Sequence, residues 1–304
     1  MKEYAYFPGC AAEASTREAD KATREVLRRL GIPLHPTEEF TCCGAGCLAE
    51  EHPRFNLALN ARNIAVAEAS ERDLLTLCNT CLLHLRKSQK ELEDLPLREE
   101  INAELGKWNL RYQGKAKVIH LLHLFQELGW ETIRSQVKRP LRGLKVAPFY
   151  GCQIVRPHYI LGPESIQEPT ILEELIEATG ATALAYRERL SCCGFHILLI
   201  DEKSSLAMAS RCLDQAQEAG ADLLVTPCTL CHISLDMYQE KAGKSVGKRY
   251  QLPVLHLAQL IGLALGIHPR KLHLQNHLVN TRPLLWGARE EQALSANGQK
   301  RFPC

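Results

Sequence analysis

Cys42-Cys43-Gly44 and Cys192-Cys193-Gly194 are two copies of one short motif, and three further cysteines surround each copy at similar offsets. In both copies, 34 residues separate the vicinal pair from a C-x-x-C pair (44–77 and 194–227). The leading gap is 31 residues in the first copy (11–41) and 39 in the second (153–191). This repetition predicts two related units. The two sets are Cys10, Cys42, Cys43, Cys78 and Cys81, and Cys152, Cys192, Cys193, Cys228 and Cys231.

The segments between the cysteines alternate between strand and helix patterns. Short apolar runs that end at a cysteine predict strands, and longer amphipathic runs predict helices. We expect Cys42-Cys43-Gly44 to open a helix. The pattern predicts an α/β fold with two pseudo-symmetric domains, each a small, mostly parallel sheet flanked by helices. The strands are expected at 4–7, 73–77, 144–149 and 222–226, and the helices at 16–30, 55–70, 170–179 and 204–220.

The 304 residues are enough for two domains with cores of their own. We expect the first domain over residues 1–143, with a polar insertion at 94–117, and the second over 144–285. Residues 286–304 are expected to form a disordered tail. Because sites in parallel sheets collect at the carboxyl ends of strands, each domain is predicted to hold one cysteine site there. The two sites are expected to face a common cleft.

Composition and charge limit the class of protein. The chain has 37 basic and 35 acidic residues. It contains no block of basic residues of the kind that binds nucleic acids, which argues against that function. We see no apolar run long enough to span a membrane and no secretory signal at the start. A cytoplasmic location is therefore expected. In that compartment, 13 cysteines indicate metal or redox chemistry rather than disulfides.

The number of thiols in each set bears on the kind of metal. Structural zinc takes four ligands, usually from two C-x-x-C pairs, whereas each half offers one such pair, a vicinal pair and a fifth cysteine. Five thiols also exceed what a cubane four-iron cluster needs. The surplus favours a larger or more open iron–sulfur cluster, with zinc in one site as the alternative. A dithiol redox pair is less favoured.

Several residues outside the two sets are candidates for other roles. His196 and His232 follow second-half cysteines and are candidate proton donors near a redox centre. Arg156 and His158 follow Cys152 and are candidate contacts for an anionic substrate. The repeated pair His120 and His256 is interpreted as structural. Three cysteines have no counterpart across the repeat and are interpreted as ordinary thiols: Cys47, Cys212 and Cys304.

At the ten repeated cysteines, the chain resembles the cysteine-rich CCG-domain family, most closely the B subunits of heterodisulfide reductases. It is also similar to the cysteine-rich subunits of non-classical succinate dehydrogenases. The resemblance covers residues 1–285 and implies that each set of five cysteines holds one noncubane [4Fe-4S] cluster. The chain lacks the C-x2-C-x2-C-x3-C run of ferredoxin-like clusters. It therefore needs partner subunits, iron–sulfur proteins or flavoproteins, that deliver or remove electrons.

The resemblance leaves two functions open. The first is an oxidoreductase subunit that cleaves or forms a disulfide at paired clusters. The second is a subunit of a succinate dehydrogenase or fumarate reductase-like complex that passes electrons to quinone, with peripheral membrane contact through that complex. Residues 254–267 are apolar enough to lie on a membrane, although their match to a first-half segment favours a core helix.

Overall fold

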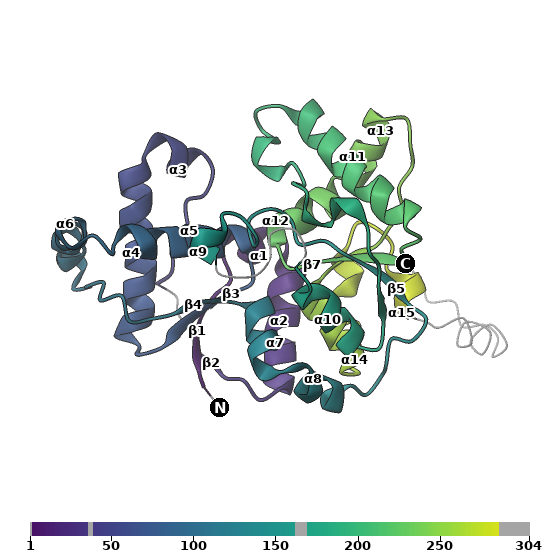
Figure 1. Ribbon diagram of the computed structural model, residues 1–304, viewed down its shortest axis with the longest axis horizontal. Coiled ribbons are helices and arrows are strands. Elements are labelled where there is room, and N and C mark those ends of the chain that lie inside the picture. Colours follow the sequence, from purple (N-terminus) through teal and green to yellow (C-terminus); the bar gives the residue numbers. More distant parts are fainter. Residues whose placement is uncertain (1, 36–38, 162–168, 286–304) are drawn as a thin grey trace, which may run out of the picture.

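The computed structural model describes residues 2–35, 39–161 and 169–285, which fold into two similar α/β halves (Figure 1). Each half contains a four-stranded sheet, with strand order β2-β1-β3-β4 in the first and β6-β5-β7-β8 in the second. All the strand pairings in the two sheets are parallel. The predicted fold class, two pseudo-symmetric α/β units with parallel sheets, is confirmed. The predicted tail at 286–304 lies outside the described residues.

The elements of the first half alternate as the repeat predicted. The strands are β1 (Tyr4–Phe7), β2 (Leu34–His35), β3 (Asp73–Thr76) and β4 (Val118–His120). The helices are α1 (Cys10–Ala14), α2 (Arg17–Arg29), α3 (Cys47–Glu51), α4 (Pro53–Ala69), α5 (Asn79–Glu91), α6 (Leu95–Leu105), the 3-10 turn η1 (Gly106–Trp108), α7 (Leu121–Leu128) and α8 (Trp130–Gln136). The expected insertion at 94–117 contains α6 and η1.

The second half follows the same order. The strands are β5 (Lys145–Pro148), β6 (Thr182–Ala183), β7 (Leu223–Thr226) and β8 (Val254–His256). The helices are α9 (His158–Leu161), α10 (Ile171–Ala178), α11 (Glu202–Glu218), α12 (Thr229–His232), α13 (Gln239–Ser245), α14 (Leu257–Ala264) and α15 (Arg282–Leu285). The shorter turns are η2 (Arg187–Leu190), η3 (Phe195–Ile197), η5 (Leu274–Asn276) and the π-helical segment η4 (Ile233–Met237).

The central strands are buried on both faces. All four residues of β1 and of β3 are buried, and Tyr4 to Phe7 pair in register with Asp73 to Thr76. Helices cover both faces of a parallel sheet, which explains why these strands are nearly continuous apolar runs rather than alternating ones. The carboxyl ends of β1 and β3 therefore lie side by side, and the cysteines that follow them meet.

The apolar segment at 254–267 belongs to the core. It forms β8 and then α14, and every residue of α14 is buried. The favoured interpretation as a core helix is therefore confirmed, and the membrane-surface alternative is wrong, because the apolar side chains are covered by the protein itself. Among the described residues, none of the helices combines the length and the apolar character needed to cross a membrane.

The expectation that Cys42-Cys43-Gly44 opens a helix is wrong. Cys42 and Cys43 lie in an irregular segment, and α3 begins only at Cys47. Gly44 and Gly46 have φ of 68° and 86°, and this left-handed backbone interrupts a right-handed helix. In the second half, Gly194 likewise has φ of 84° and is followed only by the short turn η3.

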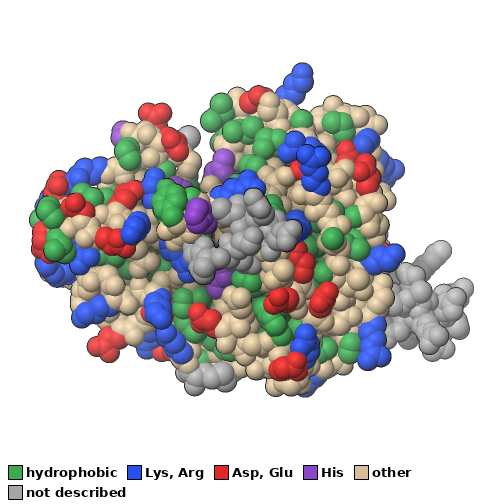
Figure 2. Space-filling view, in the orientation of Figure 1, with side chains coloured by type: hydrophobic (Ala, Val, Ile, Leu, Met, Phe, Trp, Pro, Cys, Tyr) green, Lys and Arg blue, Asp and Glu red, His purple; other side chains and the backbone are tan. Residues whose placement is uncertain are grey.

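Hydrogen bonds join the two halves at the ends of their strands. Asn79 at the start of α5 donates to the Tyr150 carbonyl at 2.6 Å, and His256 Nε2 lies 3.1 Å from the Leu77 carbonyl oxygen. Helix α2 of the first half packs against α14 of the second. On the face shown in Figure 2, acidic and basic side chains are interspersed.

Candidate metal centres

The first set of cysteines surrounds one cavity at the carboxyl end of the first sheet. Cys10 begins α1 just after β1, and Cys78 follows β3 at the N-cap position of α5. Cys81 lies in the first turn of α5, while Cys42 and Cys43 come from the irregular segment before α3. All five line a cavity of about 360 Å³. Thiols from three separate segments therefore converge on one volume.

The second set is arranged in the same way on the second sheet. Cys152 follows β5, Cys228 follows β7 at the N-cap position of α12, and Cys231 lies within α12. The vicinal pair precedes the turn η3. All five cysteines line a cavity of only about 10 Å³. The structure thus brings the ten cysteines together in the two groups of five that the repeat predicted.

In the first group, the leading cysteine lies against the first cysteine of the vicinal pair. The Sγ atoms of Cys10 and Cys42 are 3.5 Å apart. Hydrogen bonding with Cys10, and then with Cys43, lowers the pKa of Cys42. The backbone N–H of Gly44 also donates to Cys42 Sγ at 3.3 Å. A lowered pKa favours the thiolate, which is the form of cysteine that binds metals.

The second group repeats this pattern. Hydrogen bonding with Cys152 lowers the pKa of Cys192 to about 6, although burial opposes the shift. The backbone N–H of Gly194 donates to Cys192 Sγ at 3.4 Å, and the positive charge of Arg156 acts in the same direction. Arg156 is exposed, and the side chain of His158 on α9 is exposed as well. Both predicted anion contacts therefore lie at the surface, and Arg156 is the one whose charge acts on Cys192.

The two groups approach each other at their C-x-x-C pairs. Cys78 Sγ and Cys228 Sγ are 4.0 Å apart and both side chains are buried. This contact lowers the pKa of Cys78. The two groups are thus joined by a buried sulfur–sulfur contact, while the common cleft expected between the sites stays a prediction.

Two glycines allow close approach to sulfur. A Cβ added to Gly9 would lie 2.9 Å from Cys81 Sγ, and a Cβ added to Gly151 would lie 2.8 Å from Cys231 Sγ. Both glycines also have positive φ, at 78° and 70°. A side chain at either position would clash with the cysteine sulfur. Each set of five cysteines therefore lies against a backbone position, here called its cradle, that only glycine can occupy. Five convergent thiols in such a cradle fit an iron–sulfur cluster.

His196 is the predicted histidine that lies between the two groups, since it lines both cavities. Its Nε2 is 3.2 Å from Gln153 Oε1 and 3.4 Å from Thr80 Oγ1. Thr80 Oγ1 also donates to Gln153, so the three side chains form one network across the halves. Burial lowers the pKa of His196, while the negative charge of Cys78 opposes the shift.

His232 does not line either cysteine cavity. Its side chain is fully buried, and burial, followed by the charge of His277, lowers its pKa to about 3. His120 and His256 are buried at the ends of β4 and β8, where Nδ1 of each caps the following helix. Cys212 is buried on α11, as expected of an ordinary thiol. The side chain of Cys47, and Cys304, lie outside the described residues.

The comparisons with known proteins agree with this arrangement. The family model described as a cysteine-rich domain, CCG, matches twice, at residues 4–86 and 146–236. Each match contains one complete group of five cysteines. The chain belongs to the CCG cysteine-rich domain family. The resemblance stated from the sequence is confirmed.

Related proteins are subunits of oxidoreductases. The chain is 41% identical to the 8-methylmenaquinol:fumarate reductase membrane anchor subunit of Wolinella succinogenes, over 93% of this chain and 99% of that protein. It is 33% identical to the B subunit of the ferredoxin:CoB-CoM heterodisulfide reductase of Methanosarcina mazei, over 92% of this chain and 94% of that protein. A CCG protein with such relatives is an oxidoreductase subunit.

A solved structure shares the fold. A hypothetical protein from Helicobacter pylori superposes with a TM-score of 0.77 at 20% identity, covering 92% of this chain and 52% of the other. At that identity, the likeness extends to the fold alone.

Side chains that sequence reasoning missed hold the vicinal pairs in place. Asn56 and Asn60 on α4 donate to the Cys43 carbonyl at 2.8 and 2.9 Å, and Ser234 donates to the Cys193 carbonyl at 2.7 Å. A signal was available for the asparagines, because they are spaced i, i+4 and therefore share one face of a helix. Nothing comparable marked Ser234, since its contact depends on how η4 packs.

Proposed function

We propose that this chain carries one iron–sulfur cluster in each half and passes electrons between partner subunits and a quinone. The observation that carries the proposal is the 41% identity to a methylmenaquinol:fumarate reductase subunit, which extends over 99% of that relative. The partners are the iron–sulfur and flavoprotein subunits of a dehydrogenase or fumarate reductase complex. Contact with a membrane would then be peripheral and would occur through that complex.

The ten cysteines are the proposed ligands, five for each cluster. Each set supplies one thiol more than a cubane four-iron cluster needs, which supports a noncubane [4Fe-4S] cluster in each half. When bound, such clusters supply one-electron carriers. The chain's own part is to provide thiolates, to donate N–H groups from Gly44 and Gly194 to sulfur, and to exclude bulk water from the buried thiols.

The contact between Cys78 and Cys228 supports electron exchange between the halves. Their sulfur atoms are 4.0 Å apart and buried, so the ligand shells of the two proposed clusters touch. His196 is the proposed proton carrier for this region, because it lines both cavities and is hydrogen-bonded to Gln153. Burial lowers the pKa of His196, and an imidazole can both accept and release a proton.

A disulfide is the second candidate substrate. Relatives named as heterodisulfide reductase B subunits are 33% identical over more than nine-tenths of their length. The exposed side chains of Cys10 and Cys42 at the mouth of the first cavity favour access for a substrate of that kind. Arg156 and His158 are the proposed contacts for an anionic group on such a substrate.

The test begins with the full chain purified without oxygen. We expect about eight irons with matching acid-labile sulfide per chain, and an electron paramagnetic resonance signal in one redox state. Zinc in place of iron would overturn the proposal of two clusters.

The substrate is decided next by mixing the reduced protein with a menaquinone analogue or with the CoB-CoM heterodisulfide. Faster reoxidation by the quinone supports the first function, and faster reoxidation by the disulfide supports the second. His196→Gln should slow reoxidation without changing the iron content. Glutamine keeps a polar side chain at this position, but its amide does not take up or release a proton near neutral pH. The exposed His158→Gln serves as the matched control for the quinone reaction.

A further inference from the structure

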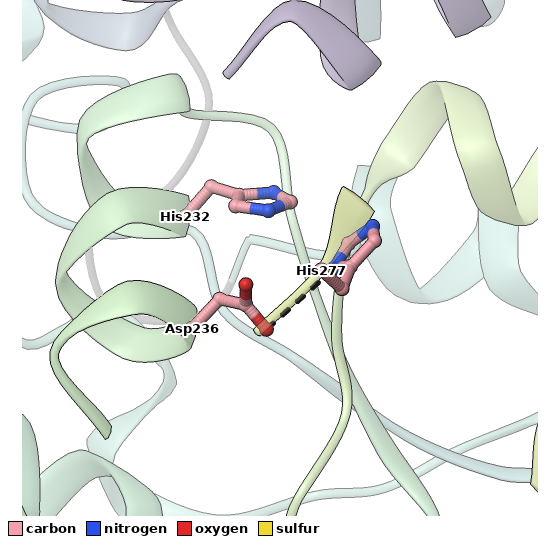
Figure 3. A group of neighbouring side chains, drawn as sticks. All are labelled: His232, Asp236 and His277. Atoms are coloured by element: carbon pink, nitrogen blue, oxygen red, sulfur yellow. Dashed lines mark ion pairs between the residues drawn. The ribbon is translucent and has the colours of Figure 1, made fainter. Parts of the chain in front are cut away.

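A group of three side chains of the types that ligate metals lies outside the ten cysteines. His232, Asp236 and His277 converge as Figure 3 shows, with His232 and Asp236 on one helical stretch and His277 on the facing segment after η5. Their potential ligand atoms all lie within 4.8 Å of one another. His277 Nδ1 is 3.6 Å from Asp236 Oδ1. The three side chains are 0%, 2% and 0% exposed, in sequence order.

Several ring nitrogens in this group of three side chains have no hydrogen-bond partner. Neither ring nitrogen of His232 has a hydrogen-bond partner, and neither does Nδ1 of His277. Buried polar atoms in proteins are almost always paired, yet these nitrogens have only long contacts to carboxylates, 3.5 Å from His232 Nε2 to Glu18 Oε1 and 3.6 Å from His277 Nδ1 to Asp236 Oδ1. A metal ion that accepts a lone pair from one nitrogen of each ring would supply the missing partner for His232 and for His277.

The other nitrogen of His277 is already held. Its Nε2 contacts the side-chain amide of Gln259, with its nitrogen at 2.9 Å and its oxygen at 3.2 Å. Gln259 is fixed in turn by the His256 backbone N–H and the Leu272 carbonyl. A metal-binding histidine commonly has its second nitrogen held by the protein in this way, which aims the first one at the metal.

Asp236 brings a buried negative charge. Burial alone would raise its pKa, but His277, His232 and the N–H of Leu278 together hold the pKa below its ordinary value. The N–H groups of Leu278 and Val279 also donate to the carboxylate, at 3.1 and 3.4 Å. A buried carboxylate is stabilised by a positive partner such as a metal ion.

We propose that His232, Asp236 and His277 bind one divalent transition-metal ion, with zinc as the best match. Two imidazole nitrogens and one carboxylate oxygen are a common zinc ligand set, which leaves a fourth position. Ligands about 2.0–2.2 Å from a tetrahedral ion lie about 3.3–3.6 Å apart. The distance of 3.6 Å between His277 and Asp236 already fits. Glu18 on α2, 3.5 Å from His232 Nε2, is the nearest candidate for the fourth ligand.

The site is a special feature of the second half. Counted from the C-x-x-C pair, the positions that match His232 and Asp236 are Leu82 and Arg86 in the first half. The ion would link the segment after η5 to α12 and η4, and α12 also contains Cys231. Its role is therefore structural, and it does not depend on the identity of the electron acceptor or on the clusters.

The experiment uses the full chain with its clusters in place. The protein is incubated with zinc, desalted, and measured for zinc, iron and sulfide, and its zinc is examined by X-ray absorption. We expect one zinc per chain with only nitrogen and oxygen neighbours at about 2.0–2.1 Å. A zinc–sulfur shell at about 2.3 Å would place the zinc at cysteines and overturn the proposal. Failure to retain zinc would also overturn it.

Variants then identify the ligands. His277→Ala and the nearly isosteric Asp236→Asn should each lose the zinc while iron and sulfide stay unchanged. The control His273→Ala alters a histidine at the other end of η5 and should keep the zinc. Retention of zinc by both ligand variants would contradict the assignment. If a variant loses iron as well, the absorption spectrum of the unmodified protein still decides between nitrogen, oxygen and sulfur ligands.

Discussion

The two cysteine groups share one backbone frame. In the first half, the Gly44 N–H lies 3.3 Å from Cys42 Sγ, and in the second the Gly194 N–H lies 3.4 Å from Cys192 Sγ. The Cys78 N–H contacts Thr76 Oγ1 at 3.4 Å, and the Cys228 N–H contacts Thr226 Oγ1 at 3.3 Å. The two halves therefore share the same backbone contacts around their cysteines.

The groups differ in access. The first surrounds about 360 Å³ and the second about 10 Å³. Cys10 and Cys42 are exposed, whereas Cys152 and Cys192 are only partly so. The leading gap is also longer in the second half, 39 residues against 31 (153–191 and 11–41). The comparison teaches that the two halves keep the same backbone contacts to sulfur while they differ in solvent access.

The largest expected effect comes from removing one thiol of each group. Cys43→Ser and Cys193→Ser should each lose about four of eight irons, because each variant loses a ligand of one cluster only. Iron and sulfide analysis checks this, and the Cys193→Ser variant should also lose turnover while its first half stays folded. Cys212→Ala, a buried thiol outside both groups, is the matched control. An unchanged iron content in either serine variant would refute the assignment of that ligand.

The next effect concerns the glycine cradles. Gly9→Ala and Gly151→Ala should each lower the iron content, because the new Cβ would lie under 3.0 Å from a cysteine sulfur. Gly46→Ala is the control, since it has a similar positive φ but no atom within 4 Å of the added Cβ. All three substitutions introduce backbone strain of about 1–3 kcal/mol, because each glycine has a positive φ. Equal iron loss in all three would mean that strain, and not the sulfur contact, is responsible.

The difference in access predicts a difference in stability toward air. The cluster that remains in Cys193→Ser belongs to the exposed first group, and the one that remains in Cys43→Ser belongs to the closed second group. We expect the first to be lost several-fold faster on exposure to oxygen, because oxidants reach Cys10 and Cys42 more readily. The decay of the cluster absorbance measures both rates. Equal rates would show that the cavity volumes do not control access.

The smallest effect distinguishes the two repeated histidines. His256 Nδ1 accepts from Ala258 N–H, so its Nε2 carries the proton and donates to the Leu77 carbonyl in the other half. His120 Nε2 has no such partner. His256→Ala should therefore destabilise the protein more than His120→Ala, by about 1–3 kcal/mol, since it leaves a buried carbonyl unpaired. Urea unfolding followed by circular dichroism compares them, and a larger loss in His120→Ala would contradict this account.

Much of the fold was predictable because the patterns that mark each strand and helix are short and occur in both halves. Short apolar runs that end at Cys10, Cys78, Cys152 and Cys228 indicated parallel strands, and the structure has them. The predicted helix at Cys42-Cys43-Gly44 failed for a local reason, since Gly44 and Gly46 adopt left-handed φ. For residues 254–267, the match between the halves correctly favoured a core helix. Apolar character alone left the membrane surface open, because it does not say whether protein or lipid covers a helix, and here the protein covers α14.

Spacing along the chain was enough to define the two groups of five cysteines and the order of strands and helices, because both follow from short-range patterns and from where parallel strands end. Tertiary packing decided what lies between and beside the groups. The contact of Cys78 with Cys228 joins residues 150 positions apart, and His277 reaches Asp236 from 41 positions away (277 − 236). Such contacts depend on how whole elements pack, which no local pattern encodes.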